Sequence, residues 1–290
     1  MRIVVASGKG GTGKTLVATS LALVAREGGP VALVDADVEA PNDALFMHPT
    51  IAAREPIMQP QPVVDAELCT HCGRCAEVCQ YNAIASLPES TLVFTDLCHG
   101  CGSCMLNCPA GAIIEEYRPI GYLETGETQG IRFAQGILQV GEAMATPIIR
   151  ALGKKASTAG WDSEGLTVVD APPGSACPVI EALSDADLAL LVTEPTPFGL
   201  HDLKLAVQVA RDVLGRTVAI VINKHGTGDP AVEEYCQEEN LPVLLRIPLE
   251  RRIAEAYSSG QPLVQALPEF EPGFGALLEG AQALVAGRAS

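Results

Sequence analysis

Aromatic and basic residues are scarce in this sequence. Only 4% of its 290 residues are aromatic, and 19 Lys and Arg stand against 35 Asp and Glu. The net charge of -16 excludes the broad basic face with which proteins follow nucleic-acid phosphates, so we expect no nucleic-acid partner. No apolar run reaches the roughly 18 residues of a membrane span, and the chain opens on a strand-like segment rather than on a leader. The helical tail at 274–290 has Arg288 as its only cation, so we expect it to pack on the domain rather than on a membrane. These absences predict a cytoplasmic protein without a membrane partner.

Cysteine, by contrast, is abundant, and its distribution is uneven. The chain contains 10 Cys, of which eight lie between 69 and 108. In a reducing compartment, clustered thiols bind metal more often than they form disulfides. A metal-binding segment is therefore predicted within a chain whose length suggests two domains.

Short apolar strands alternate with helical patterns on both sides of the cysteine segment. This alternation predicts an α/β fold with a mainly parallel sheet that helices cover on both faces. We expect one domain from 1–60 and 119–290, interrupted by an inserted domain at 61–118. The expected helix lies at 14–26, and the expected strands lie at 3–6, 31–34, 166–169, 188–193, 218–223 and 242–247.

A glycine-rich loop follows the first expected strand and precedes the first expected helix. It fits the pattern G-x-x-x-x-G-K-[ST], in which glycines let backbone amides approach phosphate oxygens. Lys14 would neutralise the β- and γ-phosphates, and the hydroxyl of Thr15 would bind Mg2+. The nucleotide-binding residues of the loop are Gly8, Gly10, Gly11, Thr12, Gly13, Lys14 and Thr15.

Lys9, directly after the first glycine, makes the loop a variant. Gly-Lys-Gly-Gly-Thr-Gly-Lys-Thr resembles the deviant Walker A loop of the MinD/ParA/Mrp family of P-loop ATPases. The resemblance implies a P-loop NTPase fold of the SIMIBI type and ATP hydrolysis, which we expect to be slow and stimulated by a partner. It also implies a homodimer across ATP, in which Lys9 reaches the partner's nucleotide and acts in catalysis with Lys14.

Two further segments resemble the switches of that family. In the first, the resemblance implies that Asp37 positions the attacking water, while Asp35 and Asn42 support Mg2+ and water. In the second, Asp170 would hold Mg2+ through water, and the amide of Gly174 would sense the γ-phosphate. An Asp after a strand is often only a helix N-cap, so the order and spacing of the segments carry the prediction.

Two late strands end in segments that resemble those around adenine in the family. The residues implied to contact the base are Asn223, Lys224 and Pro248.

The cysteine segment contains an internal repeat. The spacing C-x2-C-x2-C-x3-C occurs twice, with every matching Cys offset by 29. Zinc sites use two C-x2-C pairs rather than triplets with a trailing Cys, so Zn2+ is the weaker alternative.

The segment as a whole resembles a bacterial ferredoxin with two 4Fe-4S clusters, although Gln80 stands where that family usually has Pro. In such proteins the fourth Cys of each run binds the other cluster. This assigns Cys69, Cys72, Cys75 and Cys108 to cluster one, and Cys98, Cys101, Cys104 and Cys79 to cluster two.

Two cysteines lie outside this repeat. We expect Cys177 to be a small buried residue, the alternative being that two copies, one per subunit, hold a metal or a cluster. We expect Cys236 to be structural.

A nucleotide switch beside two redox centres first suggests ATP-gated electron transfer to a redox partner. The alternative is an ATPase that assembles or carries iron–sulfur or metal cofactors for an acceptor protein, as Mrp-type relatives do. A spatial organiser of the MinD/ParA type is a third hypothesis. Residues 119–160 fit none of this chemistry.

Overall fold

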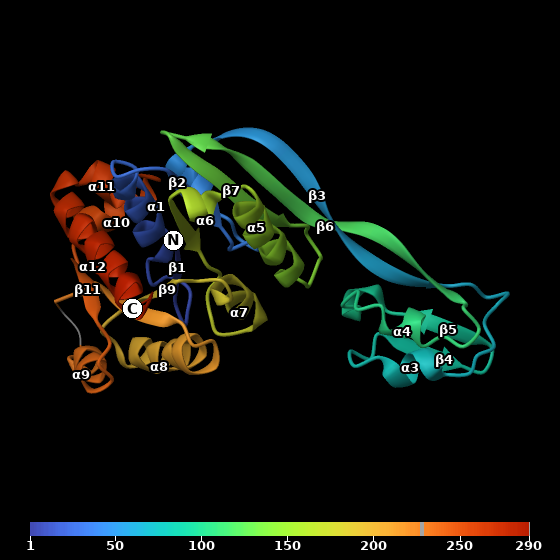
Figure 1. The fold of residues 1–290 in the computed structure, drawn as a ribbon. Helices are drawn as coiled ribbons and strands as arrows, with labels where there is room; N and C mark the ends of the chain where they lie inside the picture. The colour runs from blue at the N-terminus through green and yellow to red at the C-terminus, as the bar shows by residue number, and fades with distance from the viewer. Residues whose placement is uncertain (227–228, 290) are drawn as a thin grey trace.

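The structure, a computed structural model, describes residues 1–226 and 229–289, without the side chains of 288 and 289. One sheet of nine strands runs through the described chain (Figure 1). The first seven strands of the sheet are parallel, whereas β6 and β3 form an antiparallel extension at its edge. The predicted, mainly parallel α/β sheet is therefore confirmed. In spatial order the strands are β11 (Val243–Pro248), β10 (Thr217–His225), β9 (Leu188–Thr193), β1 (Arg2–Ala6), β8 (Leu166–Asp170), β2 (Val31–Asp35), β7 (Ile131–Leu138), β6 (Ile113–Thr128) and β3 (Thr50–Val64).

Helices cover both faces of the sheet (Figure 1). One face carries α1 (Lys14–Ala25), α2 (Asp43–Met47), α10 (Arg251–Ser258), α11 (Leu263–Ala266), η3 (Pro268–Phe270) and α12 (Glu271–Ala289). The other carries α5 (Thr146–Thr158), α7 (Cys177–Leu183), α8 (Pro197–Val207), its π-helical continuation η2 (Gln208–Val213) and α9 (Ala231–Glu238). The short α6 (Trp161–Glu164) leads into β8.

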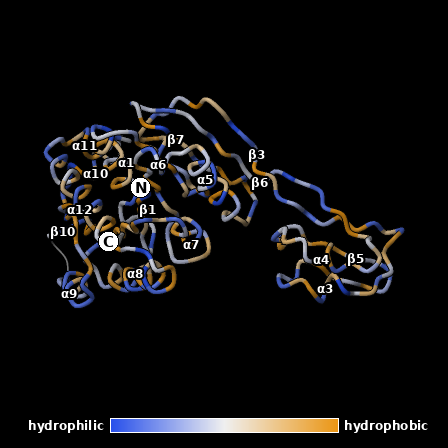
Figure 2. The backbone as a smooth tube through the Cα atoms, viewed as in Figure 1, coloured by the Kyte–Doolittle hydropathy of each residue, from blue (hydrophilic) through white to orange (hydrophobic). Residues whose placement is uncertain are grey.

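Alternating residues of the central strands supply two separate apolar cores. Ile3 and Val5 of β1 belong to the core under α1, whereas Val4 belongs to the core under α5 and α7. All three side chains are fully buried. Each contributes about 1.5–3 kcal/mol by leaving water, which explains why the apolar strand pattern predicted the sheet. In Figure 2, apolar stretches of the backbone occur in the body and also in the ribbon and the lobe.

The C-terminal helix packs on the body as expected. Phe274, Leu277 and Ala281 of α12 are fully buried, and the helix lies against α1 and β11. Ser290 and the side chain of Arg288 lie outside the described part of the chain. Among the described helices, none is long and apolar enough to cross a membrane.

Strands β3 and β6 form a long ribbon that leaves the body (Figure 1). Their pairing extends from Thr50 opposite Glu127 to Val64 opposite Ile113. The ribbon ends in a lobe of residues 65–112, which contains α3 (Arg74–Val78), β4 (Ile84–Leu87), β5 (Ser90–Val93), η1 (Thr95–Leu97) and α4 (Ser103–Leu106). The predicted domain boundaries at 61 and 118 lie within the ribbon, and the division into 1–60 with 119–290 and 61–118 stays a prediction.

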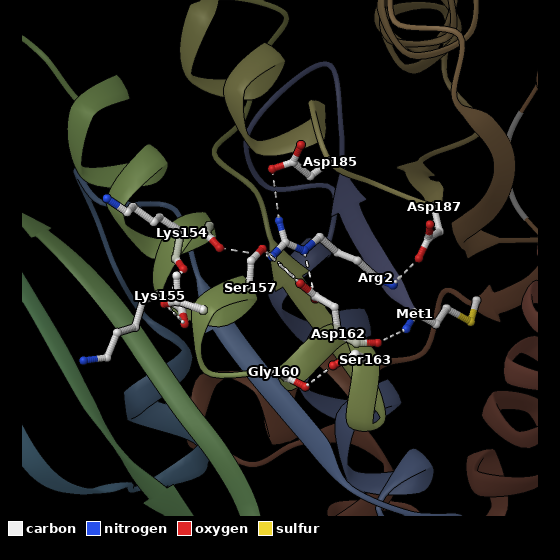
Figure 3. Close-up of polar contacts among 12 residues, drawn as sticks. Met1, Arg2, Lys154, Lys155, Ser157, Gly160, Asp162, Ser163, Asp185 and Asp187 are labelled. Carbon is white, nitrogen blue, oxygen red and sulfur yellow. Dashed lines mark hydrogen bonds and ion pairs between the residues drawn. The ribbon is translucent and has the colours of Figure 1, made fainter.

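The start of the chain is anchored by residues of α5, of α6 and of the segment that follows α7 (Figure 3). The amide of Arg2 donates to Asp187 at 2.7 Å, and its guanidinium donates to Asp162 at 2.8 Å and to Ser157 at 3.2 Å. These bonds satisfy a cation whose side chain is only 5% exposed. They fix the first strand, at whose far end the glycine-rich loop begins.

Candidate functional site

The glycine-rich loop has two positions at which only glycine fits. A Cβ atom on Gly8 would lie 2.4 Å from the carbonyl oxygen of Asp202, and one on Gly13 would lie 2.3 Å from Nδ2 of Asn223. Gly13 also has φ of 99°, which L side chains rarely adopt. A Cβ on Gly10 would meet no atom within 4 Å. Asp202 and Asn223 thus pack against one side of the loop, whereas the side at Gly10, where phosphates would approach, is open.

The first residues of α1 meet the end of β8. The hydroxyl of Thr15 donates to Asp170 at 2.6 Å, and both side chains are buried together with Lys14. Burial raises the pKa of Asp170 to about 6, although the Thr15 hydrogen bond and the Lys14 charge oppose the shift. The structure therefore brings together three residues predicted separately from the loop and the second switch.

Asp35, at the end of β2, organises the loop that follows it. Its carboxylate accepts hydrogen bonds from the amides of Asp37 at 3.1 Å, Asn42 at 2.8 Å and Asp43 at 2.9 Å. Burial, followed by the neighbouring Asp170, raises the pKa of Asp35 to about 8. Burial also raises the pKa of Asp37, against the charge of Lys14. We call residues 36–42 the Asp37 loop.

Asp43 is a site residue that the sequence analysis missed. It is fully buried beside Asp170, and neither of its oxygens has a hydrogen-bond donor among the described groups. Burial, followed by the charges of Asp35 and Asp170, raises the pKa of Asp43 well above its usual value. The unpartnered oxygens of Asp43 and Oδ1 of Asp170 are buried acceptors of the kind that waters of a hydrated Mg2+ ion would fill.

Glu194, a second missed residue, holds both lysines at the mouth of the loop. Lys9 donates to its Oε1, and Lys224 donates to its Oε2 at 2.9 Å. Partial burial alone would raise the pKa of Glu194, but the two lysines outweigh it and lower that pKa. In this state Lys9 is bound within its own chain rather than free to reach a partner.

A cavity next to the loop contains the residues predicted to contact adenine. It measures about 660 Å³, including the part open to solvent, and Asn223, Lys224 and Pro248 line it together with Gly11 and Tyr257. Tyr257, on α10, is a third residue without a local sequence signal. Its ring centroid lies 4.8 Å from that of Phe46 on α2.

Gly174 lies beyond β8 with φ of 101°. Its amide donates to the carbonyl of Ser7 at 3.0 Å. To sense a γ-phosphate, this amide would have to leave Ser7, so the predicted role stays a prediction.

The lobe contains two cavities, each lined by four cysteines. One, of about 320 Å³, is lined by the set Cys69, Cys72, Cys75 and Cys108. The other, of about 400 Å³, is lined by the set Cys98, Cys101, Cys104 and Cys79. The trailing cysteine of each run therefore lies with the opposite triplet, in the grouping expected from the resemblance.

Backbone amides point at several of these sulfur atoms. Ala83 donates to Sγ of Cys79 at 3.2 Å, and Ala112 donates to Sγ of Cys108 at 3.3 Å. Such donors stabilise thiolate ligands and tune a bound cluster. Gly73 and Gly102, with φ of 80° and 70°, begin α3 and α4 at matching places in the two runs.

In the described part of the chain, no three Cys, His, Asp or Glu side chains converge on a point that could hold one metal ion. A single Zn2+ ion needs such a point, because its ligands lie about 2.0–2.3 Å from it. A 4Fe-4S cluster takes each thiolate on a different iron, so its ligands stand further apart. The binding of a cluster by each set of four cysteines stays a prediction.

The two remaining cysteines differ in exposure. Cys236 is buried on α9, as expected. The expectation that Cys177 is buried is wrong, because it lies exposed at the first residue of α7. The buried face of α7 begins two residues later, at Val179.

Comparison with known proteins agrees with the geometry of the glycine-rich loop. The family model of the CobQ/CobB/MinD/ParA nucleotide-binding domain matches residues 3–263. The chain belongs to this family. An uncharacterized protein of Methanocaldococcus jannaschii is 35% identical over 227 residues, which cover 78% of this chain and 79% of that protein.

Two other similar proteins share less sequence identity with this chain. The iron-sulfur cluster carrier protein of Pyrococcus horikoshii is 25% identical over 98% of this chain and 85% of its own length. The septum site-determining protein MinD of Pyrococcus horikoshii, complexed with Mg-ADP, superposes with a TM-score of 0.59 at 18% identity, over 100% of this chain and 98% of that chain. At such low identity, this likeness to MinD shows the fold alone.

Proposed function

We propose that this family member is an ATPase that carries or assembles iron–sulfur clusters for an acceptor protein. The proposal rests on one observation: the chain has both a phosphate-binding type of loop and a lobe with two cavities. Four of the eight cysteines of the lobe line each cavity. Relatives named iron-sulfur cluster carrier proteins support it. They favour this alternative over the electron-transfer function that the sequence placed first.

In the proposed ATPase cycle, the loop amides and Lys14 bind the phosphates. Thr15 and Asp170 hold Mg2+, which when bound would withdraw charge from the transferring phosphoryl group. Asp37 orients the attacking water, and Asp35 keeps the Asp37 loop in place through three amide hydrogen bonds.

Dimer formation is the second part of the proposal. Lys9 would leave Glu194 and reach the nucleotide of a second copy, so ATP would sit between two chains. Release of Lys9 costs its ion pair with Glu194, so closure would be conditional on ATP and we expect a slow basal rate of hydrolysis. We place this homodimer in the cytoplasm.

In the lobe, each set of four thiolates would bind one 4Fe-4S cluster. The amides that face the sulfurs of Cys79 and Cys108 would offset the negative charge of the bound clusters. The lobe has few large buried apolar side chains, chiefly Ile84 and Ile113, so cluster binding would also stabilise its fold.

ATP-gated electron transfer is the second candidate function. Each cavity already has a complete set of four cysteines, and a complete set favours retention of a cluster over its release. In that case the clusters stay in the lobe, and electrons rather than iron pass to the partner.

One transfer experiment separates the two functions. The anaerobically loaded protein is mixed with an apo-ferredoxin acceptor, with MgATP, with MgADP or without nucleotide, and iron is counted in both proteins. The carrier function predicts faster iron transfer with MgATP, loss of that effect in Lys14→Ala, and its retention in Lys154→Ala, an exposed lysine outside the loop. Equal transfer under all three conditions would exclude the carrier function. In a parallel assay the chemically reduced, loaded protein is mixed with a holo-ferredoxin. Retained iron together with an ATP-dependent rate of holo-ferredoxin reduction would select electron transfer.

A further inference from the structure

The end of β7 is hydrogen bonded to the Asp37 loop. The amide of Leu138 donates to the carbonyl of Val38 at 2.8 Å. The side chain of Val38 also covers Gly136, because a Cβ there would lie 2.6 Å from Val38 Cγ1 and 2.7 Å from Ile148. Val38 is thus fixed between β7 and α5, one residue after Asp37. A movement of the Asp37 loop must therefore move or break its contact with β7.

The same segment continues to the ribbon. Beyond Leu138, the amide of Gln139 donates to Ile120 of β6 at 2.9 Å, and a turn brings Glu142 back towards that strand. The carboxylate of Glu142 forms a two-pronged ion pair with Arg118 of β6. This pair is largely enclosed, with side-chain exposures of 14% for Glu142 and 31% for Arg118.

From Arg118 the contacts lead into the lobe. Arg118 lies opposite Gln59 in the ribbon, and the buried Gln59 donates from Nε2 to the carbonyl of Cys98 at 3.1 Å. The same Nε2 lies 4.0 Å from Sδ of Met144, which follows Glu142. Gly100 packs against the ribbon so closely that a Cβ would lie 2.9 Å from the carbonyl oxygen of Pro60.

The first run of cysteines meets the ribbon at a different place. Cys75 packs with Val64 and Ile113 at the end of the ribbon next to the lobe, and Sγ of Cys69 faces His71 and Thr91 inside the lobe. None of these contacts involves the turn that contains Glu142. Ribbon residues line both cavities, but Gln59, beside the turn that contains Glu142, bonds to the loop of the cavity lined by Cys98.

We propose that Gln59, Arg118 and Glu142 are positioning residues that connect the nucleotide site to cluster two and leave cluster one uncoupled. The inference rests on the proposed function, since it requires both clusters and a bound nucleotide. Movement of the Asp37 loop shifts the end of β7 and the ion pair between Glu142 and Arg118. This shift in turn moves the side-chain amide of Gln59, which donates to the carbonyl of Cys98. Nearby charge and hydrogen bonding set the potential of an iron–sulfur cluster, so cluster two senses the nucleotide.

The test is an EPR-monitored redox titration of the fully loaded chain, with and without MgATP. In the unaltered protein we expect MgATP to shift the midpoint potential of one cluster, and Cys101→Ser identifies that cluster as the second by changing its signal. Glu142→Gln and Gln59→Ala each remove the shift while both clusters remain. The matched control is Glu55→Gln, which breaks another ion pair of the ribbon, to Lys155 at 3.0 Å, away from the Cys98 loop. It keeps the shift.

Three results overturn the inference: the shift persists in both variants, cluster one shifts equally, or neither cluster responds to MgATP. If iron loading and ATP-dependent delivery to an acceptor survive in that case, the proposed function stands without the coupling. A chain that takes up no iron and sulfide removes the proposed function itself.

Discussion

Gly13→Ala should lower the stability of the protein, whereas Gly10→Ala should lower only its affinity for nucleotide. At Gly13, φ of 99° costs an L residue roughly 1–2 kcal/mol. The new methyl would also displace Nδ2 of Asn223 and break its 2.8 Å bond to Thr12, which is worth about 1 kcal/mol. The sum, about 2–3 kcal/mol, corresponds to a Tm decrease of roughly 4–12 °C for a body of this size.

Gly10→Ala is the matched comparison. Its Cβ would meet no atom within 4 Å, so stability should change by no more than about 0.5 kcal/mol. The methyl would occupy the open side of the loop, where it should weaken nucleotide binding by about tenfold or more, or at least 1.4 kcal/mol.

The assay combines thermal unfolding with nucleotide binding. The chain has one Trp, Trp161 of α6, whose fluorescence reports unfolding of the body rather than of the lobe. Titration with a fluorescent ATP analogue gives the affinity. The reasoning is refuted if Gly13→Ala melts at the temperature of the unaltered protein, or if Gly10→Ala binds nucleotide as tightly as that protein does.

Three other predictions follow from the same geometry. Glu194→Gln should free Lys9 and strengthen ATP-dependent dimerisation by about 2–5-fold, the equivalent of ~0.5–1 kcal/mol for a partly exposed ion pair; weaker dimerisation in sedimentation experiments would show that Glu194 acts across the interface. Cys108→Ser should disturb the cluster bound by the first cysteine run and spare the other, as judged by EPR, and loss of only the second-run signal would disprove the crossed assignment. Burial raises the pKa of Asp35 to about 8 and that of Asp170 to about 6, well above the usual range of an Asp side chain, so the folded state retains protons that the unfolded state releases. The nucleotide-free protein should therefore lose stability as pH rises from about 4 to 8, most visibly in Tm measured without Mg2+; a Tm that rises over this range would contradict the burial argument.

The sequence predicted the body well because its strands are buried on both faces. Continuous apolar runs such as 188–193 reproduce β9 residue for residue, and the expected helix at 14–26 differs from α1 by one residue. The loop residues Lys14 and Thr15 were also predictable, since their role depends on local spacing rather than on distant partners.

The ribbon was not predicted because its sequence contradicts the usual strand pattern. Pro56, Pro60 and Pro62 interrupt β3, and proline removes a hydrogen bond from any central strand. The structure tolerates them because β3 is the edge of the sheet and pairs only with β6. Pro119 of β6 lies next to a register shift, where the ladder is already irregular.

Residues 119–160, which fit no chemistry in the sequence, become intelligible through their contacts. They supply most of β6 and the whole of β7 and α5. They also contain the turn with Glu142, whose carboxylate pairs with Arg118. Asp43, Glu194 and Tyr257 were missed for a related reason. Their partners lie far away in the chain, so no local spacing marks them as site residues.

The central claim, that the nucleotide site acts on iron–sulfur clusters in the lobe, is tested most directly by one anaerobic measurement. Iron and sulfide are counted in the purified chain, and EPR spectra of the reduced protein are recorded with and without MgATP. The account predicts about eight irons and eight sulfides per chain, with a spectrum that changes when MgATP is added. A chain without iron, or a fully loaded chain whose spectrum and midpoint potentials ignore MgATP, would contradict it.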